Sequence, residues 1–319
     1  MDVDARTISK RQDLQGSKFE QALDVAACIV RDGAGRVLMA ERRADQLSAG
    51  HWELPGGKLE PGETAAAAAA RELFEETGLK ADGLKPFATY CHRFPTRRVN
   101  LTIFEVSHWQ GIPAGREHQR VDWVDPSAPH LSPLLPSNIK ALQLLSLPRV
   151  VLGTLAPCCN TPIWAQSVVK TAQTLGAGAI LLTDQNLIAA QRASLARRLA
   201  SQSARSGLPL WVEDGGAPQQ AALQVVSDRS LLPASRSSST IYGLIERDVL
   251  RLVKELTPQA DFFIVPLPKV EDDTRGAWQA FATLTATAAT PVYAMIPDDP
   301  AAQAAVIAAG GSGVCIAAQ

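Results

Sequence analysis

Short apolar runs separated by turn residues dominate the first part of the chain. Residues 25–30 (VAACIV) and 36–43 (RVLMAERR) flank a DGAG turn, a pattern that predicts a β-hairpin. The glycine- and proline-rich stretch HWELPGGKLEPGE follows and predicts a loop. The run TAAAAAARELFEETG then predicts a helix that begins at Thr64 and stops at Gly78.

The apolar pattern after this helix returns to strands. The strand-like runs are FATYCHRF, VNLTIFEVSHW and RVDWVD, and a short helix is predicted at SNIKALQLL. Strands arranged around one central helix predict an α+β sandwich over residues 21–147. Residues 1–20 are polar and lack apolar periodicity, so they predict an N-terminal tail.

From Pro148 onward, apolar strands alternate with alanine-rich helical stretches. The candidate strands are VVLGTLA, GAILLTD, LPLWVEDG, RSLLPAS, TIYGLIE, DFFIVPLP, PVYAMIP and SGVCIAA. Eight strands with intervening helices are what a (β/α)8 barrel of the TIM type requires. We therefore predict an α/β barrel over residues 148–319, with a minimal crossover between the fourth and fifth strands.

Composition and charge exclude several classes of protein. With 46% hydrophobic and 20% charged residues, the chain has the composition of an ordinary globular protein. It has no apolar run of membrane-spanning length, and its first residues are charged where a signal peptide is apolar, so we expect a cytoplasmic protein without a membrane partner. Residues 1–148 hold 18 Lys+Arg against 19 Asp+Glu, and residues 149–319 hold 13 against 13. Neither part has the basic excess that direct nucleic-acid binding needs.

The distribution of cysteine and histidine points to the first part of the chain. Five cysteines without a C-x-x-C pair argue against a disulfide framework and a zinc knuckle, and Cys158 and Cys159 are predicted to be buried packing residues. All five histidines precede residue 149. The second part therefore has no histidine for acid–base chemistry or metal binding.

Three glutamates of the predicted helix share one face. Glu72, Glu75 and Glu76 have i, i+3 and i+4 spacing, and like charges crowded in this way need a compensating cation. Mg²⁺ prefers carboxylate oxygens and retains waters for substrate phosphates. Arg71 can pair with the cluster, and Glu63 lies at the start of the helix. Taken alone, such a cluster is more often a solvated helix face.

The surrounding string changes this interpretation. It matches the pattern G-x5-E-x7-R-E-U-x-E-E-x-G-U, where U is an apolar residue, at every specified position. The matching residues are Gly57, Glu63, Arg71, Glu72, Leu73, Glu75, Glu76, Gly78 and Leu79. The stretch therefore resembles a Nudix box, and residues 21–145 resemble MutT-type Nudix hydrolases.

This resemblance implies an activity and a set of site residues. MutT-type enzymes use Mg²⁺, or alternatively Mn²⁺, to hydrolyse oxidised purine nucleoside triphosphates such as 8-oxo-dGTP to the monophosphate and pyrophosphate, a role in nucleotide-pool sanitising and mutation avoidance. The implied metal ligands are the Gly56 carbonyl, Glu72, Glu75, Glu76 and Glu117. Arg71 joins the implied catalytic set, and either Glu72 or Glu117 orients or deprotonates the attacking water.

The resemblance also implies a base pocket. Arg42 or Arg43, Arg97 and Asn138 match its polar residues. An amide can pair with a purine edge as donor and acceptor at once, although Asn138 also suits a helix N-cap. Leu54 stands where the bacterial enzyme has an aromatic residue before P-G-G, which is a departure from the family pattern.

Residues 149–319 resemble thiamine-phosphate synthase and its TenI-like relatives in strand order. Asp298 and Asp299 replace the glycine-rich phosphate loop of that family, while Asp184, Glu213 and Asp214 lie at strand ends. We interpret this part as a degenerate barrel that binds a small-molecule ligand or regulates the first part. The alternative for the whole chain is a Nudix hydrolase of another diphosphate, including a thiamine-related one.

Overall fold

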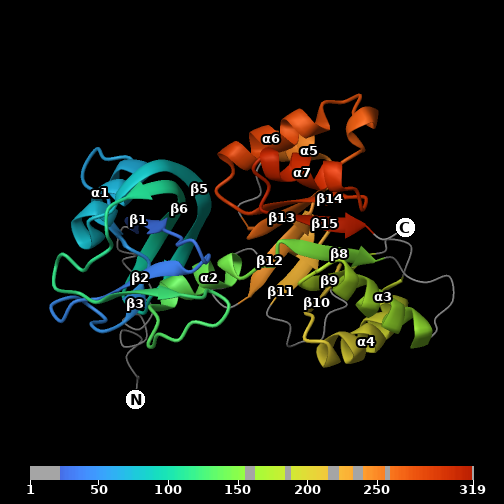
Figure 1. Cartoon of the computed structure of the whole chain (residues 1–319), viewed down its shortest axis with the longest axis horizontal. Helices are drawn as coiled ribbons and strands as arrows, with labels where there is room; N and C mark the ends of the chain where they lie inside the picture. The colour runs from blue at the N-terminus through green and yellow to red at the C-terminus, as the bar shows by residue number, and fades with distance from the viewer. Residues whose placement is uncertain are drawn as a thin grey trace, which may run out of the picture.

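The structure is a computed structural model of the chain, and it describes residues 22–154, 162–183, 188–214, 223–232, 240–255 and 259–317 (Figure 1). Residues 22–145 form one unit, called the N-terminal unit below, and residues 150–317 form a barrel. The predicted tail at 1–20, the Cys158–Cys159 pair and Asp184 lie outside the described residues.

Two small sheets and two helices make up the N-terminal unit. The first sheet has the order β4 (Gly56–Lys58), β1 (Leu23–Ile29), β6 (Arg98–Gln110), β5 (Lys80–Arg93). The second sheet has the order β3 (Trp52–Glu53), β2 (Val37–Glu41), β7 (Val121–Val124). The helices are α1 (Ala65–Thr77) and α2 (Pro136–Leu145). The predicted combination of strands with one central helix is therefore present.

The predicted hairpin separates into two sheets. Its turn is present, since Leu38 N donates to Val30 O at 3.0 Å, but β1 pairs with β4 and β6 while β2 pairs with β3 and β7. Most residues of both strands are buried, so each is a central strand with partners on both edges. The segment predicted as a loop supplies the two short strands β3 and β4.

Local capping signals define α1, as predicted. The Thr64 side chain accepts a hydrogen bond from Ala67 N at 3.2 Å, which satisfies one free donor of the first turn. Gly78 has φ of 75°, and its N–H donates to Phe74 O at 2.9 Å. Ala69 and Leu73 bury one side of the helix against β1.

The barrel consists of parallel strands in chain order. They are β8 (Val150–Thr154), β9 (Ala179–Leu182), β10 (Leu210–Val212), β11 (Leu223–Val226), β12 (Ile241–Ile245), β13 (Phe262–Pro266), β14 (Val292–Ile296) and β15 (Gly313–Ala317). Between β10 and β11 there is a single bridge, Glu213 to Val225, where Asp214 N donates to Val225 O at 2.9 Å. The sheet is therefore a nearly closed eight-stranded barrel within the described residues.

Helices lie on the outside of this sheet (Figure 1). They are α3 (Pro162–Thr174), α4 (Ala189–Arg205), α5 (Val249–Lys254), α6 (Ala277–Thr287) and α7 (Pro300–Ala308), with 3-10 turns η2 (Arg229–Leu231) and η3 (Val270–Asp272). In the part of the chain that the structure describes, no helix has the length and apolar character needed to cross a membrane.

The fourth predicted barrel strand was wrong. RSLLPAS begins with η2, and the strand at this position is β11, six residues earlier. The Asp228 side chain accepts from Ser230 N at 2.8 Å, a local bond that favours a turn over an extended chain. Each of the other seven predicted segments contains a strand in the described structure.

Helix α2 joins the N-terminal unit to the barrel (Figure 1). Its Ala141, Leu142 and Leu145 belong to one continuous buried cluster that runs from β1 to the barrel interior at Phe262 and Tyr293. Direct hydrogen bonds add to this contact: Thr89 N donates to Ala289 O at 3.1 Å, and Lys85 Nζ to Gly310 O at 2.7 Å. The two units therefore share a core.

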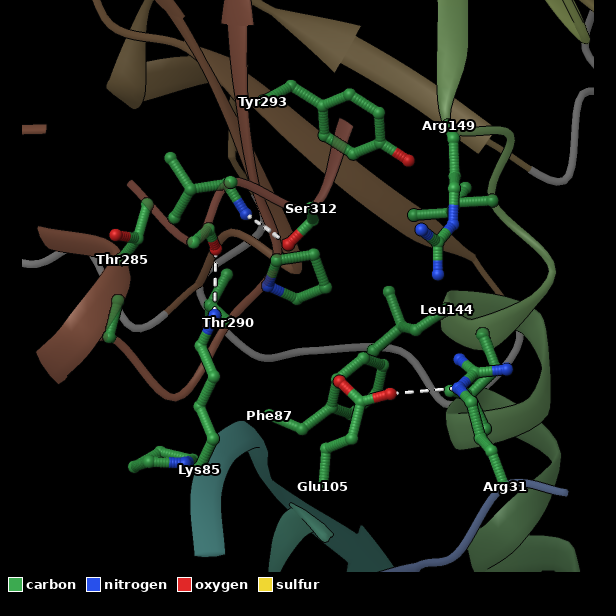
Figure 2. A pocket seen from close by; sticks show the side chains of 18 residues that line it. Arg31, Lys85, Phe87, Glu105, Leu144, Arg149, Thr285, Thr290, Tyr293 and Ser312 are labelled. Carbon is green, nitrogen blue, oxygen red and sulfur yellow. Dashed lines mark hydrogen bonds and ion pairs between the residues drawn. The ribbon is translucent and has the colours of Figure 1, made fainter. Parts of the chain in front are cut away.

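A cavity of about 140 Å³ remains between the units (Figure 2). Arg31 and Glu105 form its N-terminal wall and pair at 2.8 Å, while Thr285 and Ser312 lie on the barrel side. Arg149, Pro291 and Ser312, which directly precede β8, β14 and β15, line the cavity. The N-terminal unit therefore packs against the amino-terminal end of the barrel, away from the carboxyl ends of its strands.

Candidate active site

A cleft of about 330 Å³ opens in the N-terminal unit. It lies between α1, the first sheet, the start of α2 and the segment 42–48. The sequence-predicted site residues that line it are Arg42, Arg43, Leu54, Gly56, Gly57, Glu72, Glu76, Arg97, Glu117 and Asn138. Arg71 and Glu75 do not line the cleft. Arg71 contacts the cleft residue Glu72, and Glu75 contacts Arg71.

Two adjacent glycines bring the chain close to α1. A Cβ atom at Gly57 would collide with the carboxylate of Glu72, and a Cβ at Gly56 would collide with the backbone of β1 at Ala26 and Ala27. The Gly56 N–H donates to Glu76 Oε2 at 3.1 Å. Glycine is therefore required at both positions, because the backbone lies so close to α1 and β1 that any side chain would displace either Glu72 or β1.

Arg71 binds three glutamates. It contacts Glu63 with Nε and Nη2, both at 2.9 Å, and its Nη1 reaches Glu72 at 2.9 Å and Glu75 at 3.1 Å. Its Nη2 also donates to Lys58 O at 3.1 Å, which ties α1 to the end of β4. Planar guanidinium groups suit such multidentate contacts. Arg71 therefore fixes the orientation of Glu72.

The buried carboxylates repel one another. Burial, with the nearby charge of Glu53, raises the pKa of Glu76 to about 8. Burial also raises the pKa of Glu53 to about 7, against the opposing effect of Arg42, whose Nη1 lies 2.5 Å from Glu53 Oε1. The pKa of Glu72 is raised as well, mainly by burial. Burial in this part of the cleft therefore favours the protonated forms of Glu53, Glu72 and Glu76.

Sequence reasoning missed Glu53. It lies between the buried residues Trp52 and Leu54 and lines the cleft beside Glu76. A charged residue between two large apolar residues, two positions before Pro55 of P-G-G, was the available signal.

Glu117 lines the same cleft as the buried carboxylates. Its Oε2 pairs with Arg43 Nη1 at 2.7 Å, and its N–H donates to Gln119 Oε1 at 2.8 Å. The Glu117 side chain is 39% exposed, so it can be reached by solvent or by a ligand. Arg43 and Glu117 thus neutralise one another at the open side of the cleft.

Asn138 lies inside α2 rather than at its cap. The helix begins at Pro136 after Leu135, so the N-cap alternative was wrong. The buried Asn138 side chain accepts from Leu54 N at 3.0 Å through Oδ1 and donates to Ser137 Oγ at 3.3 Å. Arg97 and Phe94 line the same cleft, and the Arg97 guanidinium lies 5.7 Å from the centroid of the Phe94 ring.

The donor set fits a hard divalent cation. Glu72, Glu76 and Glu117 offer carboxylate oxygens around one cleft, and the pKa of Glu76 is raised by burial and, to a smaller extent, by the neighbouring carboxylates. As the side chains stand, no group of three acidic, histidine or cysteine residues among the described ones is close enough to share an ion. Arg71 and Arg43 hold Glu72, Glu75 and Glu117 instead, and an ion would compete with them.

The acidic strand ends of the barrel have structural partners. Glu213 is fully buried, accepts from Thr183 Oγ1 and pairs with Arg247 at 3.4 Å. Asp214 accepts from the backbone and side chain of Ser227. Asp299 is the N-cap of α7, and Asp298 accepts from Gln303 at 3.4 Å. These carboxylates stabilise the local fold.

Comparison with known proteins identifies relatives of the N-terminal unit. Residues 22–145 match the NUDIX domain. The chain is 33% identical to the 8-oxo-dGTP diphosphatase of Haemophilus influenzae over 126 residues, which is 40% of this chain and 93% of that protein. It is 37% identical to the CTP pyrophosphohydrolase of Escherichia coli over 119 residues, 37% of this chain and 87% of the relative.

A similar solved structure is that of a MutT NUDIX hydrolase from Burkholderia pseudomallei. It is 24% identical, with a TM-score of 0.36, and the match covers 39% of this chain and 98% of that one.

Proposed function

The chain belongs to the NUDIX family and is a hydrolase of phosphoric anhydride bonds. From this family membership we propose its substrate. We propose that the N-terminal unit is a Mg²⁺-dependent pyrophosphohydrolase of oxidised purine nucleoside triphosphates such as 8-oxo-dGTP. The observation that carries the proposal is that Glu72, Glu76 and the amide of Asn138 line one cleft. A triphosphate and its base can therefore be bound together.

Glu72, Glu75, Glu76, Glu117 and the Gly56 carbonyl would hold Mg²⁺, or Mn²⁺ in its place. When bound, the metal neutralises phosphate charge and makes water a better nucleophile. Arg71 acts as a positioning residue through its contact with Glu72.

The proposed reaction consumes one water. The water oxygen attacks one of the two phosphorus atoms of the α–β anhydride, the bond from that phosphorus to the bridging oxygen breaks, and the products are the nucleoside monophosphate and pyrophosphate. Glu72 or Glu117 orients the water and accepts its proton. Arg43 and Arg97 face the substrate from the open side of the cleft, and Asn138 pairs with the purine edge.

The substrate proposal is tested by a panel assay of the full chain. We expect kcat/KM for 8-oxo-dGTP to exceed that for dGTP by at least about tenfold, the discrimination that one added hydrogen bond supplies. The panel also includes CTP, ADP-ribose and thiamine diphosphate. Equal rates with 8-oxo-dGTP and dGTP would contradict the sanitising role, and a preference for thiamine diphosphate would favour the alternative diphosphate substrate.

For the barrel, we propose a degenerate fold similar to thiamine-phosphate synthase without catalysis of its own. The structural partners of Glu213, Asp214 and Asp299 support this proposal. We also propose that residues 21–147 and 148–319 are separate domains, and that the barrel binds a small-molecule ligand.

Replacement of Asn138 by alanine should weaken substrate binding selectively. We expect Asn138→Ala to raise KM for 8-oxo-dGTP by about tenfold, because about one hydrogen bond to the base is lost, with little change in kcat. The matched control is Asn100→Ala, which removes an amide whose contact is with Asp24 outside the cleft. If both variants behave alike in steady-state kinetics, Asn138 does not bind the base.

The stability of the metal-free protein should fall as pH rises. The pKa of Glu76 is raised to about 8, so between its ordinary value of 4.5 and 8 the folded protein holds a proton that the unfolded chain has released. Each rise in pH through this window therefore favours unfolding. In thermal melts with chelator, we expect a lower Tm at pH 8 than at pH 5.5, and a recovery on adding Mg²⁺.

Glu76→Gln should reduce this pH dependence, since the amide does not titrate. The half-exposed Glu75 provides the control, because Glu75→Gln should retain the dependence. The same slope in Glu76→Gln as in the unaltered chain would show that other groups cause it.

A further inference from the structure

Helix α2 belongs to two environments at once. Its first residues, Ser137 and Asn138, line the candidate nucleotide cleft. Ala141, Leu142 and Leu145, further along the helix, join the buried cluster that reaches the barrel interior. Any displacement of α2 relative to the barrel would therefore also move the end of the helix that faces the cleft.

A buried ion pair fixes the middle of this helix. Lys140 Nζ lies 2.7 Å from Asp261 Oδ1 of the barrel, and the two side chains are only 4% and 1% exposed. Asp261 is itself held in place, since its Oδ2 accepts from Tyr242 N at 3.0 Å in β12. Removing one charge would leave the other buried and uncompensated, so the pair strongly favours one position of α2.

Lys140 is also connected to the N-terminal unit. Its ammonium lies 5.8 Å from the centroid of the Tyr90 ring, within the range of a cation–π contact. The Tyr90 hydroxyl donates to Ser137 O at 2.7 Å, one turn before Lys140 on α2. The lysine is therefore held between a barrel carboxylate and a tyrosine that also binds the start of the helix.

The next residue leads directly into the cleft. Asn138 follows Ser137 and accepts the Leu54 N–H at 3.0 Å, and Leu54 precedes the Pro55-Gly56-Gly57 segment that contacts Glu72 and Glu76. The position of α2 relative to the first sheet therefore determines where the Asn138 amide lies in the cleft.

Contacts around the cavity between the units hold the barrel in a fixed position relative to α2. Figure 2 shows Lys85 and Phe87 of β5 facing Thr285, Thr290 and Ser312 of the barrel. The bonds from Lys85 Nζ to Gly310 O and from Thr89 N to Ala289 O cross the same boundary. Asp261 is thus presented to Lys140 by a barrel that is attached at several points.

We propose that Asp261, acting through Lys140, is a positioning residue for the nucleotide site. The barrel holds α2 in the position in which Asn138 contacts both Leu54 and the substrate base. The barrel therefore affects nucleotide affinity without contacting the nucleotide. The predicted effect on kinetics rests on the proposed function, whereas the predicted effect on the position of α2 rests on the structure alone.

The test uses the full chain with Asp261→Asn, which keeps the shape of the side chain and removes its charge. We expect KM for 8-oxo-dGTP to rise about tenfold with kcat within about twofold, since base binding and not the carboxylate site is disturbed. We also expect faster hydrogen exchange at the Leu54 amide. The matched control is Glu246→Gln, the same change at a barrel carboxylate that pairs with Arg229 at 2.8 Å.

The second measurement separates this inference from the substrate proposal. Exchange at Leu54 needs no substrate, so faster exchange in Asp261→Asn and not in Glu246→Gln supports the positioning role even if 8-oxo-dGTP is not hydrolysed. Unchanged exchange in Asp261→Asn, or an equal change in both variants, overturns it. Lys140→Met, which keeps the aliphatic stem, repeats the test from the other side of the pair if Asp261→Asn does not fold.

Discussion

Replacement of Glu76 by glutamine should lower kcat for triphosphate hydrolysis by about two to three orders of magnitude, the range seen when one preorganised electrostatic group is removed. Glutamine has the shape of glutamate and can still accept the Gly56 N–H, but it cannot carry the negative charge that a metal ligand needs. The fold should be retained, because the amide has the shape of the carboxyl group and, like the protonated Glu76 that burial favours, brings no charge into the buried site.

The measurement is steady-state hydrolysis with a thermal melt of the same preparation. Glu105→Gln serves as the control, since Glu105 pairs with Arg31 at the cavity between the units and lies outside the cleft. Near-normal activity of Glu76→Gln would refute the assignment of the metal site to this face of α1.

A methyl group at Gly57 should be nearly as damaging to activity. Gly57→Ala places a Cβ against the Glu72 carboxylate, which is the end of a flexible side chain and can move aside. We therefore expect the fold to survive and kcat to fall by about a hundredfold, the typical effect of displacing a reactive group by an ångström.

The neighbouring glycine should respond differently. Gly56→Ala directs its methyl group at the backbone of β1, which cannot move aside, so we expect a loss of about 1–3 kcal/mol in the free energy of unfolding. Gly33→Ala is the control for both, because a Cβ there meets no atom within 4 Å. If Gly57→Ala lowers the free energy of unfolding as much as Gly56→Ala does, Glu72 is not the group displaced.

Features of the fold with local causes could be predicted from the sequence. The helix α1 follows from the Thr64 cap and the Gly78 stop, and the barrel from buried apolar runs at regular spacing. Features that depend on distant pairing could not. The apolar runs of β1 and β2 do not reveal that β6 and β7 occupy their edges. The local signals that favour β11 over RSLLPAS are short: two β-branched valines in β11, the turn-forming Asp228 and a proline in RSLLPAS.

The candidate site divides in the same way. The spacing of the glutamates on α1 was sufficient to bring Glu72 and Glu76 to one cleft. The contribution of Glu53 depends on burial beside Glu76, and that of Lys140 depends on Asp261, a barrel carboxylate directly before β13. Charged residues whose partners are far away in sequence look like surface residues until the fold is known.

The distance in sequence between Lys140 and Asp261 has a consequence for synthesis of the chain. All the elements of the N-terminal unit leave the ribosome before β13 exists, yet the lysine at the centre of α2 has its carboxylate partner only there. At about 5–20 residues per second, roughly 120 residues take on the order of ten seconds. During that interval the apolar face of α2 has no barrel to cover it, so the nascent chain is most open to chaperone binding or misassociation at this helix.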